Sequence, residues 1–265
     1  MFMFTRTETS RTMHETLRSL YATMMLARHP QDVKYVFMMG DAQDNIAEGE
    51  RSRGTIRDPF ASHALEELWQ RRYHATPYDV EALLRLPAHS LGGAYARHMK
   101  ANALSPDFYP NVEPRHRMHY LRLRVRQTHD IWHVLAGFDT GMFGEVGLQG
   151  FYFAQFTNGQ SALIGAGAML KSVLRGRFAD LEMHVDAFCE GYRNGQAAES
   201  LLAVEWETRW AEPLAALRER YRIATPRCRA GDMRMDAEAA VAEKLAELVE
   251  VDARRGGQHV ETALR

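Results

Sequence analysis

Apolar residues recur every three or four positions through most of this sequence of 265 residues, and runs in which apolar and polar residues alternate are scarce. The first spacing is typical of amphipathic helices and the second of half-buried strands. We therefore expect an all-α fold, built as a single multi-helix domain. Hydrophobic residues make up 46% and charged residues 25% of the chain, the proportions of a folded protein that can bury a sizeable core.

The composition divides the chain into three parts. We expect residues 1–10 to be a loose leader and residues 11–223 to be the helical domain. Residues 224–265 form an extension with one amphipathic helix, at Asp236–Arg254, and a frayed end. Within the domain the expected helices cover residues 11–28, 62–73, 78–84, 90–99, 115–136 and 205–221, and others begin near residues 145, 159 and 178.

Two details of this pattern can be checked directly. The polar stretch from Gly40 to Arg57 is expected to interrupt the helices, since glycine and polar residues disfavour helix interiors. In the helix at residues 11–28, apolar residues at helical spacing predict an inner face. That face consists of Leu17, Leu20, Tyr21, Met24 and Met25.

Charge and cysteine content narrow the possible settings of the protein. The formal net charge is −1, so the overall balance gives no support for nucleic-acid binding. Cys189 and Cys228 are far apart and lack partners at metal-ligand spacing, which indicates reduced thiols in a cytosolic or matrix-like compartment. The uncharged segment Val146–Leu170 contains glycines, glutamines and an Asn-Gly break, and it is therefore a poor candidate for a membrane span.

The sequence HDIWH, residues 129–133, places His129 and His133 four positions apart, on one face of a helix. Glu145 would lie about 18 Å further along an unbroken helix. The glycine-rich stretch GFDTGMFG between them predicts a chain reversal that returns Glu145 to the histidines. Asp130 lies about 100° round the helix and reaches the same ion only from the flank, or orients an imidazole. Two imidazoles with one or two carboxylates suit zinc, and also iron or manganese.

Other interpretations of this motif remain. Histidines four residues apart with nearby acids also occur on solvated helix faces. A metal hydrolase resembling HExxH enzymes is a weaker alternative, because aspartate is one methylene shorter than glutamate and the surroundings are apolar. An HD-type phosphohydrolase is weaker still, because no additional histidine and aspartate pair stands out at helical positions.

Residues 129–145 form an HDxxH-x11-E pattern that resembles the signature of the coenzyme Q biosynthesis protein 4 family. The upstream segment LPAHSLGGAYARHM and the downstream segment EWETRWAEPLAALRERYRI are similar to further segments of that family. The resemblance runs from about Arg11 to Ile223. It implies that His129, Asp130, His133 and Glu145 bind a divalent ion, usually zinc, and carry the catalytic role.

The resemblance also implies a function. Such proteins are helical, often homodimeric, and act peripherally at a membrane on polyprenylated ring precursors of ubiquinone. For this chain that implies the cytoplasmic side of the inner membrane, or the matrix side in mitochondria. It further implies oxidative decarboxylation, in which a carboxylate at ring carbon 1 is replaced by a hydroxyl, with dioxygen as a co-substrate. The alternative is a non-catalytic scaffold that binds quinone intermediates and organises other ubiquinone biosynthesis proteins.

The segment after Glu145 is the candidate for the lipid side of such a site. It carries Phe151, Phe153 and Phe156, which we expect to line an apolar tunnel for the polyprenyl chain. Tight core packing explains the same residues without a ligand. Arg126 shares a helix face with Asp130 and His133, so it is expected to pair with Asp130, to receive the substrate carboxylate, or to remain solvated.

Overall fold

The computed structural model of the protein describes residues 6–29, 32–52, 56, 58–75, 78–107 and 113–226. Within these ranges the regular elements are all helices, which confirms the all-α prediction. The described elements, where η marks a short 3-10 helix, are α1 (Arg6–Arg28), α2 (Val33–Ser52), η1 (Pro59–Ala61), α3 (His63–Gln70), α4 (Val80–Leu83), α5 (Leu91–Ala101), α6 (Arg117–Ala136), α7 (Met142–Phe156), α8 (Gly159–Leu174), α9 (Phe178–Ala197), η2 (Trp206–Thr208) and α10 (Leu214–Arg220).

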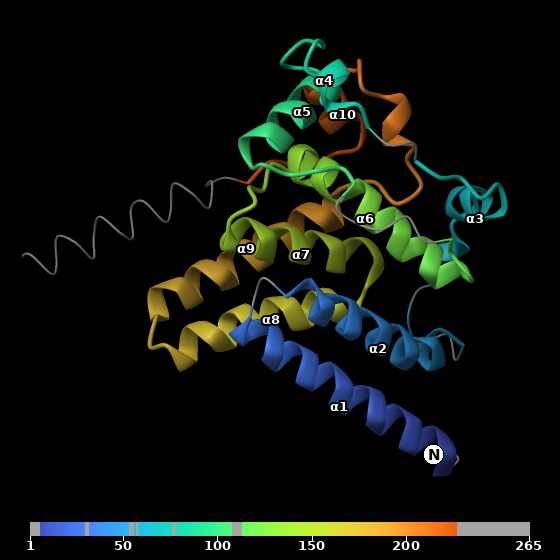
Figure 1. The fold of residues 1–265 in the computed structure, drawn as a ribbon, viewed down its shortest axis with the longest axis vertical. Helices are drawn as coiled ribbons and strands as arrows, with labels where there is room; N and C mark the ends of the chain where they lie inside the picture. Colours follow the sequence, from blue (N-terminus) through green and yellow to red (C-terminus); the bar gives the residue numbers. More distant parts are fainter. Residues whose placement is uncertain are drawn as a thin grey trace, which may run out of the picture.

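The helices are stacked in order along the long axis of the molecule (Figure 1). Helix α1 lies at one end, followed by α2 with α8, then α7 with α9, then α6, and finally α4, α5 and α10. Helix α6 is therefore covered by α7 on one side and by α5 and α10 on the other. None of the helices in the described ranges combines the length and the apolar character needed to cross a membrane.

Glycines allow the backbones of α7 and α9 to lie in direct contact. A Cβ atom at Gly191 of α9 would collide with the carbonyl oxygen of Gly147 in α7, and a Cβ at Gly150 would collide with the carbonyl oxygen of Phe188. These backbones touch because both helices lack side chains at the contact. The position of α7, which carries Glu145, is therefore fixed by α9.

Helix α2 contradicts the expected interruption at residues 40–57, because it runs unbroken through Gly40 to Ser52. Tertiary contacts explain this difference. Met39 and Ala42 are fully buried, and Gly40 is buried against the side chain of Gln160 in α8. Asp41 and Asp44 pair with Arg122 of α6. The polar residues that suggested a loop are thus contacts between helices.

Helix α1 differs from its prediction in two ways. It begins at Arg6, inside the segment expected to be a leader. The face turned towards α2 carries Glu15, Ser19 and Ala22, all at most 8% exposed. Four of the five residues predicted for the inner face are instead about half exposed, namely Leu17, Leu20, Tyr21 and Met24. Since the buried face of α1 consists of small and polar residues, a hydrophobic stripe on α1 faces outward.

Other expected boundaries agree with the structure more closely. Helix α5 follows Ser90, whose side chain accepts a hydrogen bond from the Gly93 N–H, and α8 follows Asn158 in the same manner. The helix expected at residues 205–221 is divided into η2 and α10, which begins after Pro213. The helix predicted at residues 236–254 lies outside the described residues.

Candidate metal centre

The reversal between α6 and α7 brings Glu145 back to the two histidines. Helix α6 ends at Ala136 and is capped by Gly137, whose backbone is left-handed with φ of 78°. The Asp139 carboxylate then accepts a hydrogen bond from the Gly141 N–H at 2.8 Å, and α7 begins at the next residue. Glu145 lies in the first turn of α7, where the helix dipole favours a negative charge.

Three ligand atoms converge at this turn. The Nε2 atoms of His129 and His133 are 3.2 Å apart, and the Glu145 carboxylate oxygens lie 3.3 Å from His133 Nε2 and 3.8 Å from His129 Nε2. Ligands bound to zinc at about 2.0–2.2 Å with tetrahedral angles are separated by about 3.3–3.6 Å. The three side chains, which we call the histidine group, therefore have the composition and spacing to hold one divalent ion.

Hydrogen bonds on the far side of each ring direct the two Nε2 atoms. His133 Nδ1–H donates to the carbonyl oxygen of Phe138, at 3.0 Å, which leaves the lone pair on Nε2. His129 Nδ1 lies 3.1 Å from the Tyr152 hydroxyl, which can hold that ring in the same tautomer. Both imidazoles thus present the nitrogen that binds a metal.

The group is accessible from one side only. The His133 side chain is fully buried, whereas the side chains of His129 and Glu145 are 23% and 36% exposed. Three protein ligands and one accessible side leave room for a further ligand from solution, as in catalytic rather than structural zinc sites.

Electrostatics distinguish the two histidines in the protein without metal. Burial lowers the pKa of His129, and the neighbouring His133 lowers it further. Burial also opposes the charged form of His133, but the hydrogen bond and attraction of Glu145 outweigh it and raise the pKa of His133. Burial opposes the charge of Glu145 too, yet the hydrogen bond from His133 and the charges nearby lower its pKa. A proton on His133 therefore takes the place that a cation would occupy.

Asp130 contributes no oxygen to the histidine group. It is half-buried on the flank of α6, where its charge acts on Tyr95 and His98 of α5. The ring of His98 stacks on that of His133, with centroids 5.7 Å apart and planes inclined by 23°. Sequence reasoning missed His98, because neither of the two histidines within LPAHSLGGAYARHM has a spacing that relates it to the HDxxH motif.

A cavity of about 130 Å³ lies between α2, α6, α7 and α8 and is lined in part by His129. An apolar cavity of about 150 Å³ holds one benzene molecule, so this space suits an aromatic ring rather than a long chain. Phe156 and Arg126 line it, and the Arg126 guanidinium lies 4.3 Å from the centroid of the Phe37 ring. The tunnel for a polyprenyl chain stays a prediction.

The other two predicted phenylalanines lie between helices. Phe151 is fully buried and packs edge-on against Trp132 of α6. Phe153 packs against Phe188 and Tyr192 of α9. Neither of them is among the residues that line the cavity.

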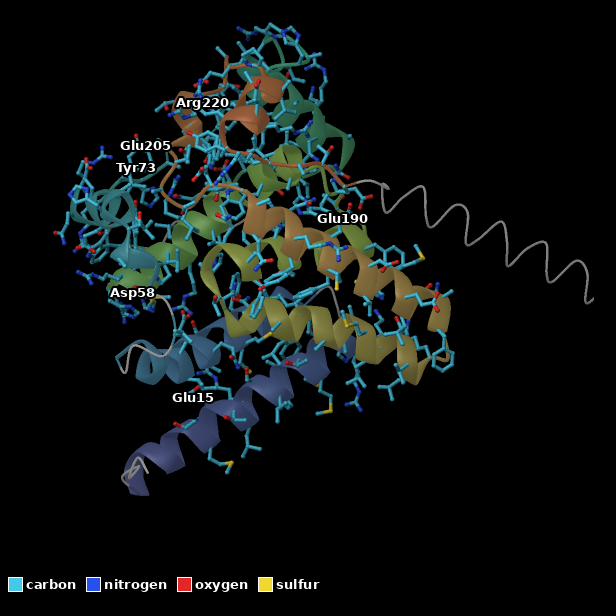
Figure 2. All side chains as sticks on the ribbon, turned by 180° about the vertical axis from the view of Figure 1, so that it is seen from behind. Glu15, Asp58, Tyr73, Glu190, Glu205 and Arg220 are labelled. Atoms are coloured by element: carbon cyan, nitrogen blue, oxygen red, sulfur yellow. The ribbon has the colours of Figure 1, made fainter. Side chains whose placement is uncertain are left out.

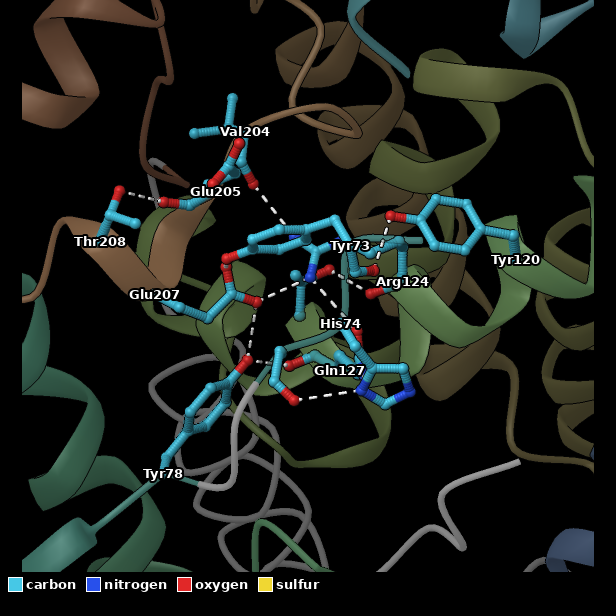
Figure 3. Close-up of polar contacts among 12 residues, drawn as sticks. Tyr73, His74, Tyr78, Tyr120, Arg124, Gln127, Val204, Glu205, Glu207 and Thr208 are labelled. Carbon is cyan, nitrogen blue, oxygen red and sulfur yellow. Dashed lines mark hydrogen bonds and ion pairs between the residues drawn. The ribbon is translucent and has the colours of Figure 1, made fainter. Parts of the chain in front are cut away.

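A second polar cluster lies one turn earlier on α6 and was not predicted (Figure 3). Arg124 forms a 2.7 Å ion pair with Glu207, and the two side chains are 1% and 6% exposed. Tyr73 and Tyr78 donate to the Glu207 carboxylate at 3.2 and 3.0 Å, and Arg124 also donates to the Val204 carbonyl oxygen at 3.1 Å. We call these residues the arginine network.

The arginine network joins the first half of α6 to the segment that follows α9. In Figure 2, Tyr73 and Glu205 lie together in this part of the molecule, away from Glu15 of α1. Burial, assisted by Glu207, raises the pKa of Tyr73 to about 12, so its hydroxyl remains a donor to Glu207 at neutral pH. The network contains no converging ligand atoms, which indicates a structural role.

The chain is similar to known proteins over most of its length. A family model described as coenzyme Q (ubiquinone) biosynthesis protein Coq4 matches residues 6–227. The mitochondrial ubiquinone biosynthesis protein COQ4 homolog of Rattus norvegicus is 33% identical over 177 residues, which cover 64% of this chain and 63% of that protein. The homolog of Xenopus tropicalis is 27% identical over 212 residues, which cover 79% of this chain and 74% of that protein.

The fold of the chain is also similar to that of a solved structure. The crystal structure of a protein from Nostoc punctiforme, assigned to ubiquinone biosynthesis, matches with a TM-score of 0.67 and 29% sequence identity. The match covers 78% of this chain and 97% of that one. The chain spans less than two thirds of the length of the rat relative.

Proposed function

The chain belongs to the coenzyme Q (ubiquinone) biosynthesis protein Coq4 family, and from this we propose that it takes part in ubiquinone biosynthesis as a metal-dependent oxidative decarboxylase. The substrate is a polyprenylated 4-hydroxybenzoate-type acid, whose carboxylate is replaced by a hydroxyl. The observation that carries the proposal is the convergence of His129, His133 and Glu145 beside a cavity of the size of one ring.

The described residues have distinct roles in this proposal. The cavity holds the aromatic ring, with Phe156 against its face and Arg126 near its anionic substituents. A divalent ion, zinc with iron or manganese as alternatives, supplies Lewis-acid chemistry at the histidine group. Phe138 and Tyr152 hold the two imidazoles in the metal-binding tautomer. Asp130, on the flank of α6, is not a member of the histidine group and acts on it through its negative charge.

Dioxygen is the oxidant in the proposed reaction. The bond between ring carbon 1 and the carboxylate breaks and carbon dioxide leaves. Water supplies the oxygen of the new hydroxyl, and dioxygen takes up the two electrons that the substrate loses and becomes hydrogen peroxide. Zinc has no redox chemistry, so with zinc the dioxygen must react with the activated ring itself.

Turnover by the purified protein tests the proposal. The protein is loaded with zinc, iron or manganese, supplied with a prenylated 4-hydroxybenzoate under oxygen, and its products are analysed by mass spectrometry. We expect a hydroxylated product without the carboxylate, and none from the Glu145→Gln variant. If no ion supports this product, the enzymatic proposal is wrong.

A second candidate function is a scaffold at a membrane, and one observation favours it. Almost all of the strongly exposed large apolar residues lie on α1 and on the hairpin between α8 and α9. At the hairpin tip, Leu174 and Phe178 are 76% and 62% exposed, and basic residues stand beside them, namely Lys171, Arg175 and Arg177. Apolar side chains among basic ones suit an anionic lipid surface.

Vesicle binding tests this attachment. We expect the protein to sediment with vesicles that contain anionic lipid and to lose this association in the Leu174→Glu/Phe178→Glu variant. The predicted homodimer is the competing explanation for the exposed stripe on α1. It is supported if Leu17→Glu yields a monomer in analytical ultracentrifugation while vesicle binding is unchanged. A scaffold without catalysis predicts that substrate binds to the protein without conversion.

A further inference from the structure

His98 approaches the histidine group from a helix that the metal motif does not include. Its imidazole lies almost parallel to that of His133, at a centroid distance of 5.7 Å. The end of α5 is tied to the reversing turn, because Asn102 donates to the His98 carbonyl oxygen and accepts from the Thr140 hydroxyl at 2.7 Å. The position of His98 relative to the candidate ion is therefore set by the same turn that positions Glu145.

The Nε2 atom of His98 is buried and has no hydrogen-bond partner among the described residues. Leaving a buried polar atom unpaired costs about 1–3 kcal/mol. Such atoms in native proteins call for an explanation, and a catalytic role or a group bound from solution is one. The orphaned atom beside the histidine group thus points to a ligand that binds there.

The surroundings of His98 indicate whether it would bind the ion itself or another ligand of the ion. His133, Asp130, His129 and Glu145 all lie near enough for their charges to act on the His98 ring. Yet His98 does not belong to the set of ligand atoms that lie within 4.8 Å of one another. The geometry therefore gives no support for a direct bond from His98 to an ion held by that set. It is consistent with a hydrogen bond from His98 to a further ligand of that ion.

We propose that His98 Nε2 is the hydrogen-bond partner of a carboxylate oxygen that occupies the open coordination position of the ion. The proposal rests on the function given above, because the carboxylate there is that of the substrate. The ring occupies the cavity beside His129, the ion lies between His129 and His133, and His98 contacts the carboxylate from the His133 side. His98 is thereby a residue that selects substrates with an acid at ring carbon 1.

The test uses the full-length protein loaded with cobalt, whose visible absorption reports the ligands of the ion. 4-Hydroxybenzoate is the carboxylate probe, and phenol is the matched probe that has the ring but no carboxylate. His98→Phe keeps the stacking on His133 without the nitrogen, and His98→Gln restores a polar atom that can donate. His63→Phe, on the exposed start of α3, is the control for loss of an imidazole elsewhere.

We expect His98→Phe to bind cobalt within about twofold of the parent protein but to bind 4-hydroxybenzoate about 10-fold to 100-fold more weakly, the range for a hydrogen bond to a charged group. Phenol binding is expected to be unchanged, and His98→Gln to recover most of the affinity. If His98→Phe fails to fold, His98→Leu replaces it as the variant without a donor.

Three results overturn the proposal. One is a parent protein that holds cobalt but binds no carboxylate, and another is a His98→Phe variant with undiminished 4-hydroxybenzoate affinity. The third is a loss of cobalt affinity as large as that of His133→Ala, which makes His98 a direct ligand. If His98→Phe loses carboxylate binding but the parent protein shows no turnover, the decarboxylase proposal is contradicted and the role of His98 in carboxylate binding is supported. If the parent protein shows turnover but His98→Phe binds carboxylate as tightly as the parent, the decarboxylase proposal is supported and the role of His98 is contradicted.

Discussion

Two polar clusters share helix α6, and they balance their charges in different ways. In the arginine network the positive charge of Arg124 is paired with the negative charge of Glu207. The Glu207 carboxylate also accepts hydrogen bonds from Tyr73 and Tyr78. In the histidine group one carboxylate faces two imidazoles, of which His133 has a raised pKa and His129 a lowered one, and the ligand atoms converge where a proton or a cation can lie. The opposite charges of the first cluster are paired within the chain, although the buried Nε atom of Arg124 has no hydrogen-bond partner among the described residues. The second cluster offers three ligand atoms to a cation from solution.

Along helix α6, one cluster is expected to serve stability and the other to serve function. Removing one member of a buried ion pair leaves an uncompensated charge, so loss of the arginine network should appear in the free energy of unfolding. An open group contributes little to the fold, so its loss should appear in metal affinity. Four predictions test this division.

The largest effect is expected from breaking the arginine network. Arg124→Met leaves the Glu207 carboxylate buried and uncompensated, and the free energy of unfolding should fall by about 3–5 kcal/mol, measured by denaturant titration. The double variant Arg124→Met/Glu207→Leu should recover part of that loss, because no buried charge remains. A single variant as stable as the parent contradicts a structural role for the network.

Glu145→Gln tests the histidine group in the opposite way. The amide keeps the shape of the side chain but removes its charge, so affinity for zinc should fall by more than about 100-fold, beyond the range for outer partners of metal ligands. The free energy of unfolding of the metal-free protein should change little. Isothermal titration gives the affinity, and Glu182→Gln, an exposed position on α9, is the matched control. Equal zinc affinity in Glu145→Gln and the control excludes Glu145 as a ligand.

Tyr152→Phe should produce a smaller change at the same group. The variant keeps the ring, which stacks on Trp132 at 4.8 Å, but removes the hydroxyl that contacts His129 Nδ1. We expect zinc affinity to fall by about 10-fold with unfolding unaffected. An unchanged affinity would show that His129 needs no partner to hold its tautomer.

The last prediction concerns the dependence of zinc affinity on pH. In the metal-free protein the pKa of His133 is raised by Glu145 above its ordinary 6.5, although burial opposes the charge, whereas the pKa of His129 is lowered. Zinc must displace the proton on His133, so affinity should be constant above that pKa and fall about tenfold for each pH unit below it. Affinity measured across pH 5–8 should therefore begin to fall at a pH above 6.5. A decline that begins only below 6.5 contradicts the raised pKa.

How far the sequence predicts this molecule depends on the sequence distance between contacting residues. The reversal at Gly137 and the approach of Glu145 to the histidines followed from 17 consecutive residues, and the structure confirms both. Glu207 lies 83 positions from Arg124, and His98 lies 35 positions before His133. No local period relates such residues, because only the packing of α5 and of the segment after α9 on α6 brings them together.

The errors have the same physical origin. Helix α2 was mistaken for a loop because Gly40 and Asp41 disfavour a helix locally, and contacts with α8 and α6 outweigh that preference. The inner face of α1 was mistaken because hydrophobic periodicity identifies an apolar stripe but not the surface that covers it. In this chain Ala22 and Ser19 face α2, and the hydrogen bond from Gln43 to the Ser19 hydroxyl, at 2.7 Å, helps to fix that choice.

The glycine contact between α7 and α9 gives the metal centre a remote point of control. Because Gly191 leaves no gap above the Gly147 carbonyl, adding a single methyl group there must push α7 aside. Glu145 stands less than one turn from Gly147 on the same rigid rod and would move with it. A substitution at this buried contact between two helices can thus shift the carboxylate of Glu145 relative to the two histidines while the three side chains stay the same.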